Sequence, residues 1–120
     1  MKKIFSIVFF LLAITYSKAQ DNFVGVWVNE LDKEEIEIYK KDDYYYAKIN
    51  NSKDTIMVLI QMVYKSDFKL YGGTYVDQKS KDENEAKVEI NKQNELTIVI
   101  IHREHIFHRR KKYIKNKISN

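Results

Sequence analysis

The chain has 120 residues and a formal net charge of +4, and it contains no cysteine, no proline and only three glycines. A chain of this length supports a single core and therefore one domain. The absence of cysteine excludes disulfides and an N-terminal lipid on cysteine. Segment 102–120 holds seven Lys and Arg residues against one Glu, whereas 20–101 is acidic. This acidic body argues against nucleic acid as the partner.

The first 19 residues have the order of a secretory signal peptide. Lys2 and Lys3 precede an apolar run over 4–14, and Ser17-Lys18-Ala19 places small residues three and one before a cleavage site. The run is shorter than the roughly 20 residues needed to span a bilayer. We therefore expect cleavage after Ala19 rather than a retained anchor. The mature chain would be exported, periplasmic or extracellular, and would not span the membrane.

Much of the remaining sequence alternates apolar and polar residues, which is typical of strands with one buried face. Ile36 and Ile38 show this pattern, as do Ala86, Val88 and Ile90. Short polar connections favour antiparallel hairpins and leave no room for crossover helices. The expected strands cover 23–30, 34–40, 43–49, 55–64, 67–76, 84–91 and 95–101. The apolar runs 56–64 and 96–101 lack the alternation, so periodicity alone also fits short buried helices there.

Seven hairpin-linked strands leave two open edges, and an eighth strand over about 104–113 would close the sheet into a barrel. The alternative for this segment is a basic amphipathic helix on an anionic membrane surface, because Ile106-Phe107 and Tyr113-Ile114 recur after seven residues. Helix initiation needs a cap and the preceding run is strand-like, which favours the strand. We expect one monomeric domain over 20–115 and a disordered basic tail over 116–120.

The only tryptophan, Trp27, stands two residues after a glycine in the first expected strand. Four motifs occur in order along the chain: Gly25-Val26-Trp27, Ile36-Glu37-Ile38-Tyr39, Tyr45-Tyr46-Ala47-Lys48-Ile49 and Gly73-Thr74-Tyr75-Val76-Asp77. This order resembles a secreted bacterial family of unknown function, which carries a G-x-W motif and is similar to the lipocalins. The resemblance implies an all-β, antiparallel, up-and-down barrel of eight strands. The chain departs from the family at Gln78, where members have proline, and at Ala47, where they have glycine.

The resemblance also implies that Trp27 closes one end of the barrel and is covered by an arginine of the last strand. Arg109 is the predicted cover, so Gly25, Trp27 and Arg109 form the structural motif. Strand geometry agrees, because Arg109 shares a face with Phe107, the large apolar side chain expected to point inward. Arg110 would then face solvent.

No group of residues in the sequence predicts catalysis. The chain has neither a cysteine nor a glycine-framed serine as nucleophile, and it has no phosphate-binding glycine loop. We therefore expect no enzymatic activity and no cofactor. His102, His105 and His108 are clustered, but a continuous strand places His105 on the opposite face from the other two. This placement argues against a metal site.

An eight-stranded barrel is either filled by its own side chains or holds one small ligand. We expect a non-catalytic binding protein for a small apolar or amphipathic molecule. The predicted lining positions, which would be plain core in a filled barrel, are Tyr45, Ala47, Val58, Val88 and Ile98. The alternative function is a filled barrel that docks on a protein or an anionic envelope surface through its basic end. The residues predicted to contact a polyanion are Arg109, Arg110, Lys111 and Lys112.

Overall fold

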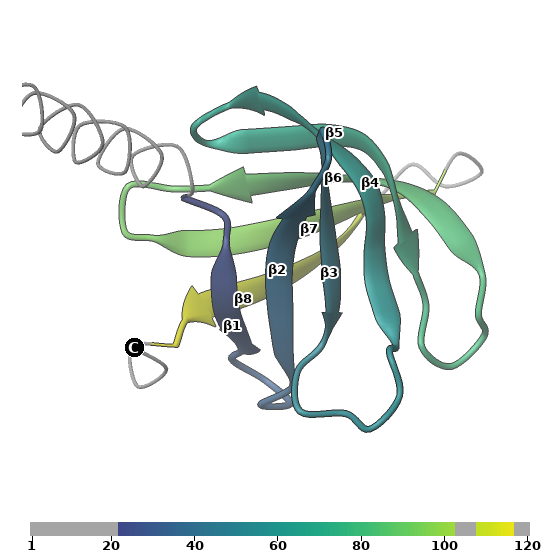
Figure 1. Cartoon of the computed structure of the whole chain (residues 1–120). Helices are drawn as coiled ribbons and strands as arrows, with labels where there is room; N and C mark the ends of the chain where they lie inside the picture. The colour runs from purple at the N-terminus through teal and green to yellow at the C-terminus, as the bar shows by residue number, and fades with distance from the viewer. Residues whose placement is uncertain (1–21, 103–107, 117–120) are drawn as a thin grey trace, which may run out of the picture.

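The computed structural model describes residues 22–102 and 108–116. Eight antiparallel strands form a closed barrel in which β8 pairs back with β1 (Figure 1). The strands are β1 (Gly25–Asn29), β2 (Glu35–Lys41), β3 (Tyr44–Ile49), β4 (Met57–Ser66), β5 (Lys69–Val76), β6 (Glu83–Ile90), β7 (Glu95–Ile101) and β8 (Arg109–Lys115). The predicted all-β, eight-stranded antiparallel barrel is therefore confirmed. In the described ranges, no helix is long and apolar enough to cross a membrane.

The first seven strands begin and end within about two residues of the predicted bounds. The two apolar runs that lacked alternation are strands β4 and β7. In β4 the pattern is broken by register shifts against β3, and Val58 and Leu59 are consequently both buried. Gln61 in the same strand has a φ of 54°, which is a backbone conformation typical of a bulge.

The last described strand, β8, runs from Arg109 to Lys115, so the amphipathic helix is wrong for this segment. The predicted strand residues 104–107, including Phe107, lie outside the described residues. The Asn116 N–H donates to the Val26 carbonyl oxygen at 2.9 Å. Pairing with β1 therefore continues one residue into the segment predicted as tail, and the remainder of that tail lies outside the described residues.

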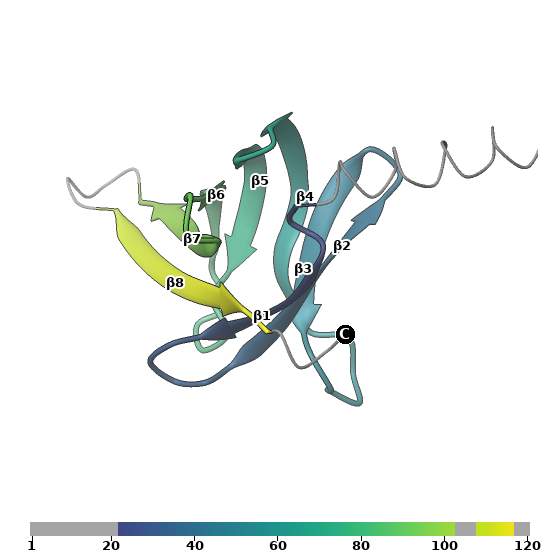
Figure 2. The same cartoon turned by 90° about the vertical axis from the view of Figure 1, so that its left-hand side faces the viewer.

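The connections fall at two ends of the barrel that differ in loop length. Segments 30–34, 50–56 and 77–82 connect strands at one end, here called the long-loop end, where β7 also ends and β8 begins. Segments 42–43, 67–68 and 91–94 connect strands at the other, the short-loop end, where residues 22–24 also enter β1 (Figures 1 and 2). Consecutive antiparallel strands run in opposite directions, so every strand extends between the long-loop end and the short-loop end.

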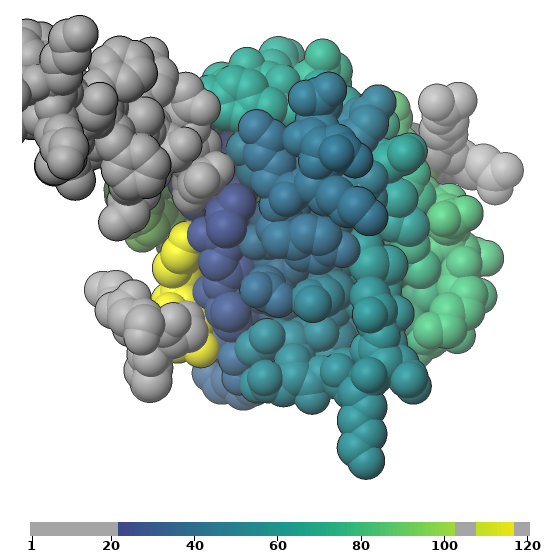
Figure 3. Space-filling view, in the orientation of Figure 1, coloured from purple at the N-terminus to yellow at the C-terminus, as the bar shows by residue number. Residues whose placement is uncertain are grey.

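The barrel interior is packed with apolar side chains, and Trp27, Tyr113 and Phe23 are the largest of the fully buried ones. The other buried core members are Ile36, Ile38, Tyr45, Ala47, Val58, Leu59, Met62, Leu70, Tyr75, Ala86, Val88, Ile90, Leu96, Ile98 and Ile100. The side chains of β1 to β4 form a continuous outer surface on one side of the barrel (Figure 3). Burial of this core is the main stabilising contribution, since the chain has no disulfide.

Candidate functional site

The short-loop end is closed by Phe23 and Trp27. The Trp27 indole N–H donates to the Phe23 carbonyl oxygen at 2.9 Å, and the Phe23 ring meets the Tyr45 ring edge-on at a centroid distance of 5.8 Å. Phe23 and Trp27 are both essentially inaccessible to solvent. This end of the barrel is therefore a packed base rather than an entrance.

Lys115, and not Arg109, covers Trp27. The Lys115 ammonium lies 4.8 Å from the indole centroid and donates to the Val24 carbonyl oxygen at 2.8 Å. Burial lowers the pKa of Lys115. Arg109 lies on the predicted inward face of β8, but its predicted position along the strand is wrong, because Trp27 pairs with Lys115 in the β1–β8 register. Arg109 lies at the long-loop end.

Gly25 provides the space for this lysine. Its φ of 141° is unfavourable for any residue with a side chain, and a Cβ atom here would lie 2.8 Å from the Lys115 ammonium nitrogen. The Lys115 chain passes over Gly25 to reach the indole ring. The spacing of Gly25 and Trp27 thus has a physical reason in this barrel.

Lys115→Ala should lower the free energy of unfolding by about 1–2 kcal/mol, because it removes a partly desolvated cation from the indole and exposes apolar surface under its stem. Chemical denaturation measures the effect. Lys112→Ala, on the outer face of the same strand, is the matched control and should change little. A larger loss in Arg109→Ala than in Lys115→Ala would contradict this assignment.

The five predicted lining residues, Tyr45, Ala47, Val58, Val88 and Ile98, all belong to the buried core of the barrel. Ala47 faces Leu59 across the β3–β4 register. Their contact with a ligand stays a prediction. Gln78 donates through its side-chain amide to the carbonyl oxygens of Val76 and Met57 at 2.9 and 3.1 Å. This side chain therefore fastens the β5–β6 connection to β4.

The long-loop end carries a polar pocket of about 310 Å³. Its lining combines three acidic, three basic and two uncharged residues: Asp32, Glu34, Asp77, Lys79, Arg109, Lys111, Tyr75 and Gln78. The side chains come from β5, β8 and the connections 30–34 and 77–82. These segments are far apart in the sequence, and closure of the barrel by β8 brings them together.

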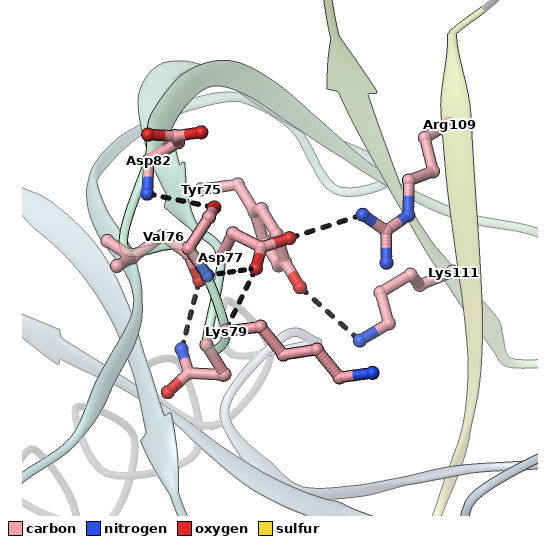
Figure 4. A network of polar contacts seen from close by, with 9 residues as sticks. Tyr75, Val76, Asp77, Lys79, Asp82, Arg109 and Lys111 are labelled. Atoms are coloured by element: carbon pink, nitrogen blue, oxygen red, sulfur yellow. Dashed lines mark hydrogen bonds and ion pairs between the residues drawn. The ribbon is translucent and has the colours of Figure 1, made fainter.

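Asp77 organises one side of this pocket (Figure 4). Its carboxylate accepts hydrogen bonds from the backbone N–H groups of Lys79 and Ser80 at 2.9 and 3.0 Å, and it pairs with the Arg109 guanidinium at 3.2 Å. The two backbone donors, followed by Arg109, lower the pKa of Asp77 to about 2. The carboxylate is therefore charged at any physiological pH, and its charge is balanced within the pocket.

Lys111 and Tyr75 form the other side of the pocket (Figure 4). The Lys111 ammonium donates to the Tyr75 hydroxyl oxygen at 3.3 Å. Tyr75 is only 2% exposed, so its ring belongs to the core while its hydroxyl reaches the pocket. Because the hydroxyl oxygen accepts from Lys111, its own proton is available to donate to another group.

Tyr113 lies deeper in the barrel, one inward-facing position along β8 from Lys111. Its side chain is fully buried, and its hydroxyl has no hydrogen-bond partner among the described residues. The neighbouring Asn29 uses its side-chain oxygen to accept from the N–H groups of Leu31 and Asp32. Burial raises the pKa of Tyr113, the nearby charge of Glu34 raises it further, and the adjacent Asn29 side chain lowers it to a smaller extent. The phenol therefore remains a neutral hydrogen-bond donor.

The four residues of the basic run alternate between the two faces of β8, although all four also border one groove beside the strand. Alternation along β8 directs Arg109 and Lys111 to the polar pocket, while Arg110 and Lys112 are exposed on the outer face of the barrel.

Of the three histidines, His102 and His108 flank the β7–β8 connection and His105 lies outside the described residues. Over 22–102 and 108–116, no three His, Cys, Asp or Glu side chains are grouped as metal ligands.

Sequence reasoning missed Lys115, Tyr113 and the Asp77–Arg109 pair as parts of a site. The alternation in 109–115 was a signal for the inward face, but it does not give the position of each residue along the barrel axis. That position depends on which residues of β1 and β8 pair. Asp77 appeared only as a member of a family motif.

No protein-family model matches the sequence, and no curated protein sequence matches it. The fold does resemble a solved structure, described as protein HP1028 from the human pathogen Helicobacter pylori, which belongs to the lipocalin family. The TM-score is 0.64 at 10% sequence identity, and the match covers 78% of this chain and 82% of that one. At this identity the likeness establishes a lipocalin-like fold.

Proposed function

We propose that the protein is an exported, non-catalytic binding protein that holds one small amphipathic molecule. The apolar part would enter the barrel from the long-loop end, where core side chains must move aside to admit it, and the polar group would stay at that end. The lipocalin-like fold supports an interior ligand, and the leader pattern of residues 1–19 supports export. The observation that carries the proposal is the buried Tyr113 hydroxyl, whose proton has no acceptor among the described residues because the adjacent Asn29 oxygen already accepts from Leu31 and Asp32. Leaving such a group unpaired costs about 1–3 kcal/mol, and a ligand atom that accepts its proton removes the cost.

The polar group of the ligand is expected to be a hydrogen-bond acceptor. Tyr113 and Tyr75 each have a phenolic proton to donate, and Lys111 adds an ammonium group beside Tyr75. The charge of the ligand's polar group is a weaker criterion for binding than its acceptor atom. The acidic and basic side chains of the pocket are equal in number, and Asp77 is already paired with Arg109. A hydroxyl, carbonyl or carboxylate oxygen on an apolar chain fits these donors.

Displacement of the apolar dye N-phenyl-1-naphthylamine tests this function. We expect 1-dodecanol and dodecanoate to displace the dye, and dodecyltrimethylammonium, whose head group has no acceptor, to compete least. Tyr113→Phe should weaken 1-dodecanol binding by about 2–10-fold, corresponding to one lost hydrogen bond, and leave dye binding unchanged. Tyr71→Phe, which removes a hydroxyl from a ring that is 48% exposed, is the matched control.

Failure of every amphiphile to displace the dye, together with failure of the dye to bind, would contradict the proposal. Equal 1-dodecanol affinities for Tyr113→Phe and the unmodified protein would remove the observation on which it rests. The alternative function, docking on an anionic envelope surface, has fewer residues in its favour than the sequence suggested. Arg109, Arg110 and Lys112 of the basic run are exposed, but Arg109 is paired with Asp77.

A further inference from the structure

Half of β8 has a strand neighbour on one side only. Pairing with β7 extends along the strand to Arg109, which lies opposite Ile100. Pairing with β1 ends at Tyr113, which lies opposite Asn29, because the chain turns into the β1–β2 connection after Asn29. Figure 2 shows this connection diverging from β8. Residues 109–112 therefore form an open edge within the wall of the barrel.

The backbone of Arg110 presents both of its polar groups to this edge. In an antiparallel strand, successive residues direct their N–H and C=O groups alternately to the two neighbouring strands. Since the Asn116 N–H bonds to Val26 of β1, residues an even number of positions away, including Arg110, also face the β1 side. In the described part of the chain, no backbone hydrogen bond joins Arg110 to the β1–β2 connection. A sheet edge of this kind is a template for another strand.

A groove of about 420 Å³ lies along the open edge. Its two sides are residues 29–32 and residues 109–112. Arg110 and Lys112 are exposed on the outer face, and Leu31 is 95% exposed at the opposite side of the groove. The groove thus combines unpaired backbone groups, the apolar Leu31, the carboxylates of Glu30 and Asp32, and the four cations of residues 109–112, so that cations outnumber carboxylates four to two.

We propose that this edge binds an extended acidic segment of another protein, which adds beside β8 as a short antiparallel strand. A Glu or Asp directly opposite Arg110 exchanges two backbone hydrogen bonds with it and places its carboxylate beside the guanidinium, within diagonal reach of Lys112. An apolar neighbour in the segment contacts Leu31. A second copy of this chain is a poor occupant, because pairing β8 with β8 brings the Arg110 and Lys112 cations of both copies together.

The groove adjoins the polar pocket, because Asp32, Arg109 and Lys111 line both, but the residues that test the two proposals differ. Arg110 and Lys112 lie on the outer face, whereas Lys111 and Tyr113 face the barrel interior. Loss of ligand binding in Tyr113→Phe therefore leaves the edge intact, and changes to the outer cations leave the interior intact.

The probe is the capped peptide acetyl-Thr-Val-Glu-Val-Thr-amide, titrated into the protein and followed by NMR. We expect the Arg110 amide to shift on binding and to become protected from hydrogen exchange. Arg110→Glu combined with Lys112→Glu should weaken binding at least about tenfold. The corresponding peptide with Lys in place of Glu should bind this double variant better than it binds the unmodified protein. Lys92→Glu, a charge reversal in the exposed β6–β7 turn, is the control and should bind the acidic peptide normally.

Two N-methylated peptides separate strand addition from simple charge attraction. Methylation of the Glu nitrogen removes the donor that faces Arg110 and should abolish binding, whereas methylation of the preceding Val nitrogen, which points away from β8, should be tolerated. Equal binding of both methylated peptides would overturn the proposal. Concentration-dependent dimers that protect the Arg110 amide without any peptide would overturn the choice of partner.

Discussion

Trp27→Ala should abolish or nearly abolish folding. The indole is 1% exposed, packs in the base of the barrel and donates a hydrogen bond to Phe23. Truncation of a buried tryptophan costs about 3–5 kcal/mol, a large part of the roughly 5–15 kcal/mol that stabilises a small domain. Far-UV circular dichroism and denaturant unfolding measure the loss. The effect is expected to be large because no disulfide limits the unfolded chain.

Trp27→Phe is the matched variant for this prediction. It keeps an aromatic ring under Lys115 but loses the indole donor and part of the volume, so it should fold with reduced stability. A Trp27→Ala protein that unfolds at the same denaturant concentration as the unmodified protein would show that Trp27 does not organise the base of the barrel.

Gly73→Ala should be the most destabilising single-methyl addition in β5, at about 3 kcal/mol. A Cβ atom at Gly73 would lie 2.6 Å from the Ile60 carbonyl oxygen and 2.8 Å from the Met62 nitrogen, and it would also overlap the Met62 sulfur. Backbone atoms cannot move aside as a flexible side chain does. Gly73 lies opposite the part of β4 that contains the irregular residue Gln61, where the two strands approach closely. Thermal unfolding of the variant measures the cost.

The adjacent Gly72 is the control for that prediction. Its φ is 76°, but a Cβ atom there meets only the Val63 methyl group at 3.8 Å. Gly72→Ala should therefore cost about 1 kcal/mol from backbone conformation alone. If Gly72→Ala and Gly73→Ala unfold at the same temperature, the close approach of β4 and β5 is not the cause of the Gly73 effect.

The sequence was sufficient for the architecture because barrel formation depends on local rules. Alternation at Ile36 and Ile38, and at Ala86 and Val88, identifies the inward face without knowledge of the partner strand. Short polar connections then determine that consecutive strands pair. The eighth strand followed from the open edges that seven strands would leave, and the β8–β1 pairing confirms that step.

The axial register of β8 was not predictable in the same way. A period of two assigns a residue to a face, but every second residue fits that description equally well. Arg109 and Lys115 have the same parity, and only the pairing of Trp27 with Lys115 decides which of them covers the indole. This pairing joins residues 88 positions apart, so it depends on closure of the complete barrel.

The hydrogen-bond donors of the proposed ligand site could not be predicted from the sequence either. Tyr113 looks like any apolar strand residue, and its unpaired hydroxyl becomes visible only when its surroundings are known. Likewise, the lowered pKa of Asp77 arises from the two amide groups of the β5–β6 turn together with an arginine from β8. Such groups depend on turn geometry and on long-range closure at the same time.

The alternation of β8 has a consequence for how this protein can change under selection. Substitutions at 110 and 112 alter the outer face of the strand, and substitutions at 109, 111 and 113 alter the inward face, of which 109 and 111 line the polar pocket. A single inserted or deleted residue within β8 has the opposite effect, because it exchanges the faces of all residues beyond it. Tyr113 and Lys115 would then turn outward and Ile114 inward. Homologues are therefore expected to keep the length of this strand constant even where individual residues of either face differ.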